Sequence, residues 1–119
     1  MKQLDQLIDK HYQEYKYPKD YALLMHMSEK HLNRICKTCL NKTTSQLIIE
    51  RVLLEAKRRL AFAKSSISQI AEELGYNSTS YFIQVFKKKT GKTPVEYIDL
   101  AINSTQAVSA YQFSNLPQF

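Results

Sequence analysis

Three observations predict that this chain folds as an all-α protein of seven helices. Two glycines and three prolines among 119 residues are too few for a turn-rich sheet protein. No segment alternates apolar and polar residues strictly, as a half-buried strand would. Serine, threonine and asparagine instead flank runs in which apolar residues recur three and four positions apart, which is typical of amphipathic helices with capped ends.

Three helices are expected ahead of Asn41. The first spans about Leu4–Tyr15, and one face of it carries Leu4, Leu7, Ile8, His11 and Tyr15. Pro18 ends the link to a short second helix at about Asp20–Met25. The third begins after the capping residue Ser28 and ends at Asn41, a residue type that tolerates a left-handed backbone. Its expected core side chains are Leu32, Ile35, Cys36 and Leu40.

Four further helices follow. The fourth spans about Thr44–Ala63, or about 30 Å, and its apolar residues stand at four-residue steps: Ile48, Val52, Ala56 and Leu60. The fifth stops at Gly75 and carries Ile67, Ile70, Ala71 and Leu74 at amphipathic spacing. The sixth spans Ser78–Thr90, with Phe82, Val85 and Phe86 turned inward. The seventh spans about Pro94–Ala101.

Capping boxes mark the starts of three of these helices. In this pattern a serine or threonine is followed three residues later by glutamate or glutamine, so that each side chain can bond the other's backbone amide. The pattern occurs at Thr43–Gln46, Ser66–Gln69 and Thr93–Glu96. Pro94 supports the last of them, because proline suits the first helical position.

The chain contains an internal repeat. The segment from Leu32 to Ile48 recurs fifty residues later, from Phe82 to Ile98, with matched apolar residues, a matched Lys-Thr pair and a matched helix end at Asn41 and Gly91. Upstream, Ala22 matches Ala71 at an offset of forty-nine. A duplicated helical unit in a small basic protein indicates two copies of one binding element.

Each copy consists of a short helix, a tight turn and a second helix, which is the helix-turn-helix arrangement used on DNA. The predicted fold is therefore two helix-turn-helix subdomains joined by a long linker helix. Residues 1–43 hold the N-terminal helix and the first subdomain, 44–63 the linker, and 64–102 the second subdomain with its closing helix. The uncharged residues 103–119 leave open a flexible tail, an extra packing segment or a non-native addition.

Composition and charge narrow the function classes. The net charge of +6 favours a polyanionic partner, although many basic proteins have none. No apolar run is long enough to span a bilayer, and the N-terminus lacks the layout of a secretory signal. We therefore expect no membrane contact and a cytoplasmic location.

Catalytic and metal chemistry have little support. Cys36 and Cys39 have a C-x-x-C spacing, but no second Cys/His pair completes a zinc site, and the repeat aligns Cys36 with the core residue Phe86. The sequence has no glycine-rich phosphate loop, no H-E-x-x-H and no nucleophile elbow. We expect neither an enzyme nor a bound metal or cofactor.

The outward faces of the third and sixth helices carry the candidate DNA contacts. Arginine and lysine can donate to guanine, asparagine and glutamine can pair with adenine, and short hydroxyl groups can meet a base or a phosphate. The candidate base-reading residues are Lys30, Asn33, Arg34, Thr79, Ser80 and Gln84. The candidate contacts to the DNA backbone are Ser28, His31, Lys37, Lys42, Ser78, Tyr81, Lys87, Lys88 and Lys92.

The second unit reads Ala71-x-x-Leu74-Gly75-Tyr76-x-Ser78-x-Ser80-Tyr81-Phe82-x-x-x-Phe86-Lys87-Lys88-x-x-Gly91-x-x-Pro94-x-Glu96-Tyr97. This strongly resembles the signature of the AraC/XylS family of bacterial transcription regulators, and with the first unit the resemblance covers roughly residues 17–98. The first unit departs from the family pattern at His26, where a glycine commonly turns the chain, and at Cys36, where phenylalanine is usual.

The resemblance implies a domain of seven helices that binds duplex DNA at a promoter or operator, with base contacts from the six residues named above. It also implies a packing and ion-pairing role for Arg51. RNA polymerase is a further expected partner, and the isolated domain is expected to be a monomer. Because these regulators usually carry a separate sensing domain, the chain is either a fragment or a stand-alone member. The alternative is a basic helical module that docks an acidic protein without sequence-specific DNA binding.

Overall fold

The computed structural model describes residues 2–62 and 64–102, and these residues form helices and no strand. Six helices are α1 (Lys2–His11), α2 (Pro18–Leu24), α3 (Glu29–Leu40), α4 (Thr44–Phe62), α5 (Ile67–Glu73) and α6 (Thr79–Thr90). Residues 94–102 form a further helical segment. The prediction of an all-α fold with seven helices is confirmed. The predicted tail at 103–119 lies outside the described residues.

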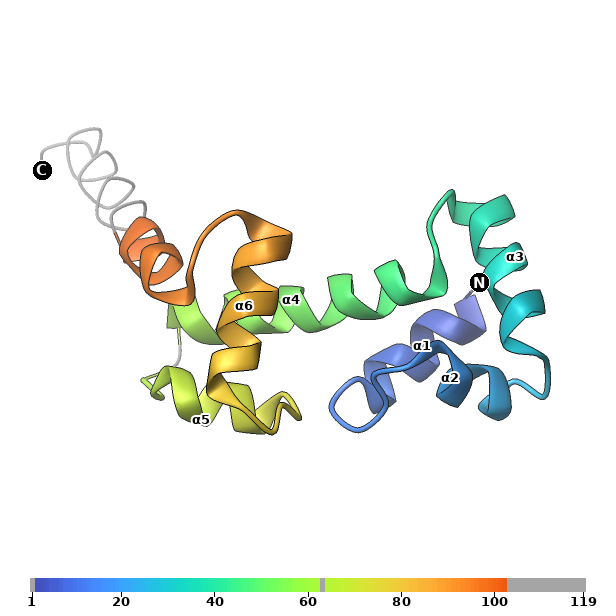
Figure 1. The fold of residues 1–119 in the computed structure, drawn as a ribbon, viewed down its shortest axis with the longest axis horizontal. Coiled ribbons are helices and arrows are strands. Elements are labelled where there is room, and N and C mark those ends of the chain that lie inside the picture. The colour runs from blue at the N-terminus through green and yellow to red at the C-terminus, as the bar shows by residue number, and fades with distance from the viewer. Residues whose placement is uncertain (1, 63, 103–119) are drawn as a thin grey trace, which may run out of the picture.

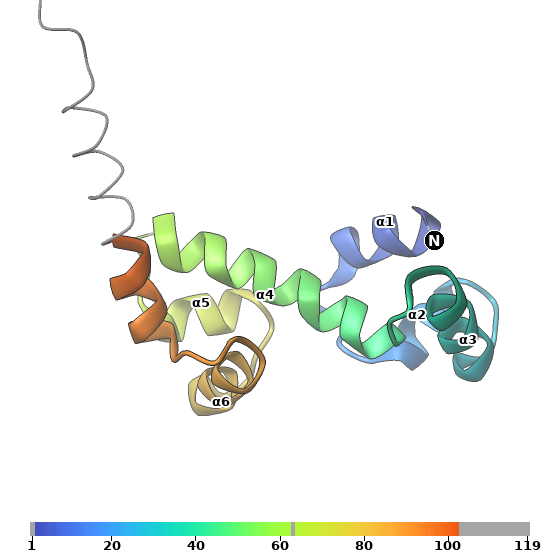
Figure 2. The same cartoon turned by 90° about the horizontal axis from the view of Figure 1, so that it is seen from above.

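Helix α4 crosses the middle of the molecule and joins two groups of helices (Figure 1). The first unit, α1–α3, packs at its N-terminal end, and the second unit, α5 through residue 102, packs at its C-terminal end. Figure 1 shows α3 and α6 rising in the same direction, and both are seen nearly along their axes in Figure 2. The two repeated helices therefore run parallel at opposite ends of α4.

The core follows the predicted periodicity. In α4 the buried side chains include Ile48, Val52, Ala56 and Leu60, which form one stripe along the helix. The matched positions of the repeat are buried in both units, with Leu32 and Cys36 in α3 and Phe82 and Phe86 in α6. Cys36 is therefore a core residue as predicted, and its sulfur accepts a hydrogen bond from the Thr44 hydroxyl at 3.4 Å.

The predicted caps are present at the three capping-box positions. The Thr43 hydroxyl accepts from the Gln46 amide at 3.0 Å, and the Gln46 side chain accepts from the Thr43 amide at 2.8 Å. Ser66 accepts from the Gln69 amide at 3.1 Å, and Thr93 from the Glu96 amide at 3.2 Å. These bonds satisfy orphan amides at helix starts, which explains why the starts are legible in the sequence.

The two units also repeat each other in backbone geometry. Asn41 ends α3 with φ +55°, and Gly91 ends α6 with φ +82°, both in the left-handed region as predicted. The turns inside the units match as well, with His26 at φ +57° and Gly75 at φ +88°. His26 thus adopts the conformation that glycine commonly supplies at this turn.

The structure corrects several details. Helix α1 ends at His11 and not at Tyr15, because residues 12–14 form a turn that reverses the chain toward the second unit. Helix α2 spans Pro18–Leu24 and not Asp20–Met25, since proline suits a first helical turn, whose amides are unpaired. Leu40, the last residue of α3, is 41% exposed and not in the core. Ser78 caps α6 from outside the helix.

Candidate nucleic-acid interface

Helices α3 and α6 are positioned alike by their N-caps and by their buried faces. The Ser28 hydroxyl accepts from the His31 amide at 3.0 Å, and the Ser78 hydroxyl accepts from the Tyr81 amide at 3.2 Å. Both caps occupy the same place in the repeat, so each helix starts with one turn of amides close to solvent. The hydroxyls of Ser28 and Ser78 therefore serve as caps in this structure, while both residues remain exposed.

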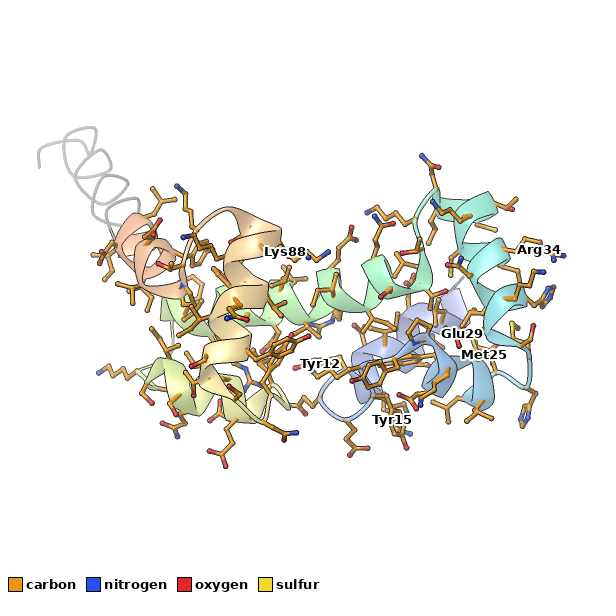
Figure 3. All side chains as sticks on the ribbon, in the orientation of Figure 1. Tyr12, Tyr15, Met25, Glu29, Arg34 and Lys88 are labelled. Carbon is orange, nitrogen blue, oxygen red and sulfur yellow. The ribbon has the colours of Figure 1, made fainter. Side chains whose placement is uncertain are left out.

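The outward face of α3 is basic. Lys30, His31, Arg34 and Lys37 are all exposed. Figure 3 shows Arg34 pointing away from the body of the molecule. Within the described residues Arg34 forms no ion pair, so its five donors remain available to a ligand. Arg34 and Lys30 are the α3 side chains best suited to donate to an acceptor such as guanine.

Asn33 differs from its neighbours, because its side chain is half-buried and bonded within the protein. Its Oδ1 accepts from the Thr44 amide at the start of α4, at 3.1 Å. The amide group of Asn33 is left with two N–H donors for any other partner. Asn33 thus connects α3 to α4 in addition to its predicted place on the recognition face.

The outward face of α6 is polar near its start and basic near its end. Ser80 and Gln84 are exposed, whereas Thr79 is half-buried and its hydroxyl donates to the Ser68 hydroxyl of α5 at 3.2 Å. Tyr81 is 58% exposed, with its ring 6.0 Å from that of Tyr76. The structure therefore presents Ser80, Tyr81 and Gln84 openly and holds Thr79 against α5.

Five of the nine candidate phosphate contacts are lysines, and four of these form no ion pair within residues 2–62 and 64–102. Lys37, Lys87, Lys88 and Lys92 are exposed, and Figure 3 shows Lys88 on the side of α6 that faces the first unit. Lys42 is also exposed but pairs with Glu50 at 3.0 Å. An exposed pair of this kind is worth at most about 1 kcal/mol, so Lys42 can exchange Glu50 for a phosphate. Positive charge thus lies near both α3 and α6.

A groove of about 880 Å³ lies between the two units. One wall is α6, with Tyr81, Val85 and Lys88, and the opposite wall is the start of α4, with Ser45 and Gln46. Sequence reasoning missed Ser45 and Gln46 as groove residues. No local signal indicates them, because the groove forms only where the start of α4 comes near α6.

Arg51 is half-buried on α4, beside α1. Its Nε donates to the Asp9 carboxylate at 2.6 Å, and its guanidinium stands 4.6 Å from the centroid of the Tyr12 ring. Burial lowers the pKa of Arg51, but the hydrogen bond and charge of Asp9 outweigh it, so that the pKa is raised. The expected packing and pairing role of Arg51 is confirmed.

Residues 2–62 and 64–102 contain neither a candidate metal site nor a membrane-spanning helix. No cluster of three or more His, Cys, Asp or Glu side chains could hold a metal ion there. Nor does any helix in those ranges combine the length and apolarity needed to cross a membrane.

Known proteins resemble this chain in sequence and in fold. A family model described as a helix-turn-helix domain matches residues 21–99. The HTH-type transcriptional regulator YisR of Bacillus subtilis is 29% identical over 99 residues, which cover 83% of this chain and 34% of the relative. The C-terminal domain of AraT, a response regulator from Geobacillus stearothermophilus, superposes with a TM-score of 0.77 at 27% identity, covering 83% of each chain.

A third match supports the fold. The DNA-binding domain of AdpA, solved in complex with a target DNA, has a TM-score of 0.72 at 19% identity and covers 95% of this chain and 93% of that one. The chain spans about a third of the length of the first curated relatives that it matches. The matched residues run from α2 through the helical segment at 94–102, and the chain therefore belongs to the AraC/XylS family of helix-turn-helix proteins.

Proposed function

We propose that this chain binds a specific duplex DNA sequence by placing α3 and α6 in two successive major grooves on one face of the helix. The observation that carries the proposal is the parallel arrangement of α3 and α6 at the two ends of α4, each with an exposed polar face. The 19 residues of α4 span about 28 Å. That length is comparable to the repeat of about 34 Å that separates successive major grooves.

The predicted side chains then have distinct roles. Base reading falls to Lys30, Asn33 and Arg34 from the first unit and to Thr79, Ser80 and Gln84 from the second. Of these, Asn33 and Thr79 contribute through the groups that their internal hydrogen bonds leave free. The contacts to phosphate and sugar are assigned to Ser28, His31, Lys37, Lys42, Ser78, Tyr81, Lys87, Lys88 and Lys92.

The proposed function implies an oligomeric state, a location and a partner. The units predicted at 1–43 and 64–102 each carry one recognition helix, and the isolated domain acts as a monomer because one chain supplies both. As part of a bacterial transcription regulator it works in the cytoplasm, next to RNA polymerase. The related regulators are about three times longer than the matched part, so other parts of such proteins supply further functions.

Selection of bound duplexes from a random library tests the proposal. We expect an asymmetric consensus with two conserved blocks one helical turn apart, because the two recognition helices differ in sequence. Binding to the selected duplex should weaken steeply with salt and should exceed binding to random DNA by at least about a thousandfold. Equal affinity for selected and random duplexes, with salt-dependent binding to acidic proteins, would instead support the protein-docking module.

A further inference from the structure

The turn that follows α1 reaches across to the second unit. Helix α5 ends at Glu73, and the amides of residues 74–76 bond the carbonyls of residues 70–72. The carbonyls of Glu73 and Leu74 accept from side chains instead. The side chain of Gln13 donates to the Glu73 carbonyl at 3.0 Å, and the ammonium of Lys16 donates to the Leu74 carbonyl. Residues 60 and 58 positions away in the sequence thus cap the C-terminus of α5.

Lys16 sits at the centre of this contact. Its ammonium also donates to the Tyr12 carbonyl at 2.6 Å and stands 5.0 Å from the centroid of the Tyr76 ring. A lysine ammonium has three donors, and a backbone carbonyl from each unit accepts one of them. The Tyr76 ring in turn packs on Phe82 of α6, with centroids 5.3 Å apart. The contact therefore extends from the first unit to the recognition helix of the second.

The backbones of the two units also touch. A Cβ atom on Gly75 would lie 2.0 Å from the Gln13 carbonyl oxygen, much closer than van der Waals contact allows. The matching turn residue of the first unit, His26, has a similar positive φ yet carries an exposed side chain. Positive φ alone is therefore compatible with a side chain at this turn. The approach of Gln13 is what excludes one at Gly75.

The ion pairs among the described residues lie within α4 or join a unit to α4. Arg51 on α4 pairs with Asp9 of α1, and Arg59 on α4 pairs with Glu73 of α5 at 2.6 Å. These pairs attach each unit to α4. With these pairs alone, the angle between the units would depend on how stiff α4 is. The hydrogen bonds of Gln13 and Lys16 join the two units directly, in addition to the connection through α4.

We propose that Gln13 and Lys16 form a latch between the units that sets the orientation of α6 relative to α3, and thereby the half-site spacing that the chain accepts on DNA. Both are positioning residues, since they lie on the loop after α1 and act on DNA through Tyr76 and Phe82. The inference rests on the proposed function, in which both recognition helices read DNA.

The test compares a latch variant, Gln13→Ala with Lys16→Met, with a matched control, Gln6→Ala with Lys10→Met. The control removes the same two side-chain types from exposed positions on α1. The probes are the duplex selected by the unmodified protein and the same duplex with one base pair inserted between its two blocks. Insertion turns one half-site by about a tenth of a helical turn relative to the other.

For the unmodified protein and the control, we expect the insertion to weaken binding at least about tenfold. For the latch variant we expect this ratio to fall to about threefold or less, because the second unit can reorient to follow the displaced half-site. The ratio compares two duplexes with one protein sample, so a smaller folded fraction cancels. An unchanged ratio in the latch variant would overturn the latch, whereas no penalty in the unmodified protein would overturn the two-groove function itself.

A measurement without DNA provides a second test. Cys39 is exposed on α3 and Cys36 is buried, so a spin label attaches at Cys39 and a second at Lys89→Cys on α6. Pulsed electron paramagnetic resonance then reports the distances between the two recognition helices. We expect a wider distance distribution in the latch variant than in the control. Identical distributions would count against the latch whatever the DNA result.

Discussion

Asn33 on α3 and Thr44 on α4 are joined by a hydrogen bond of 3.1 Å from the Thr44 amide to the Asn33 side-chain oxygen. One side chain on the predicted DNA-reading face thereby also caps the linker helix. The two roles use different atoms of Asn33, because the oxygen accepts inside the protein and the nitrogen is left to donate outward. They can therefore be separated by mutation.

Asn33→Ala should lower the free energy of unfolding by about 1 kcal/mol, since it leaves the Thr44 amide without its side-chain partner. Asn33→Asp should keep most of that stability, because a carboxylate oxygen can still accept from Thr44. Both variants should weaken binding to the selected duplex. Urea denaturation and DNA titration of the two variants check this. Equal destabilisation by Ala and Asp would show that the bond contributes little.

Arg34→Ala should weaken binding to the selected duplex by about 1 to 3 kcal/mol and relax discrimination at one position, since it removes a base-reading group. Lys88→Ala should weaken all duplexes similarly and reduce the salt slope by about one. Titrations of both variants against selected and random DNA over a salt series measure these effects. Equal losses on both duplexes for Arg34→Ala would remove Arg34 from the base-reading set.

Phe86→Ala should cost about 3 to 5 kcal/mol of stability, because Phe86 is 0% exposed and its ring packs 5.9 Å from Phe82 and 5.8 Å from Tyr97. Tyr81→Ala is the control on the same helix, since that ring is largely exposed, and should cost much less. Thermal and urea unfolding give the comparison. Similar losses for the two variants would contradict the assigned orientation of α6.

Glu55→Gln should lower stability by about 1 to 2 kcal/mol, because its half-buried carboxylate lies within ion-pair distance of Arg51, Arg58 and Arg59. Glu50→Gln is the matched control, since Glu50 is exposed and pairs with Lys42. That change should cost less than about 0.5 kcal/mol. Urea denaturation at low and high salt checks both values. Equal losses in the two variants would show that the ion pairs of Glu55 contribute no more than an exposed pair.

The pH dependence of stability should contain a contribution from Lys16. Burial lowers the pKa of Lys16 from 10.5 to about 8 in the folded protein. Between these values the unfolded chain binds more protons at this site than the folded chain, so the contribution of Lys16 to stability should rise with pH. Tyr76 beside it remains neutral there, since burial raises its pKa to about 12, and the nearby Glu73 carboxylate remains paired with Arg59.

The check is the difference in unfolding free energy between the unmodified protein and Lys16→Met, measured in urea from pH 7 to pH 10. Subtraction removes the titrations that both proteins share. We expect the difference to shift in favour of the unmodified protein above pH 8. A difference that stays flat over this range would mean that Lys16 keeps its ordinary pKa in the folded state.

Much of the fold could be predicted because it depends on neighbours in the chain. The cap at Thr43, the left-handed ends at Asn41 and Gly91, and the buried stripe of α4 are each set by residues within a few positions. The exposure of Lys30, Arg34 and Gln84 follows from the same periodicity, since their helices bury the opposite face. These predictions needed no knowledge of how the units meet.

The errors and omissions arise where the outcome depends on distant residues. The early end of α1 was missed because the turn after it contacts the second unit, which no local pattern shows. The internal bond of Asn33 was missed because its partner begins another helix. Lys16 looks like any solvated lysine in the sequence, and Gly75 looks like an ordinary turn glycine.

The sequence by itself determined the seven helices, their caps, the repeated unit and the polar faces of α3 and α6, because hydrogen bonding and side-chain periodicity along a helix are local. Only the tertiary structure decided how the two units are oriented, through the contacts of Gln13 and Lys16 with the end of α5. The physical reason is that carbonyl groups at a helix end accept a donor from wherever the fold brings one, and no local pattern specifies that donor.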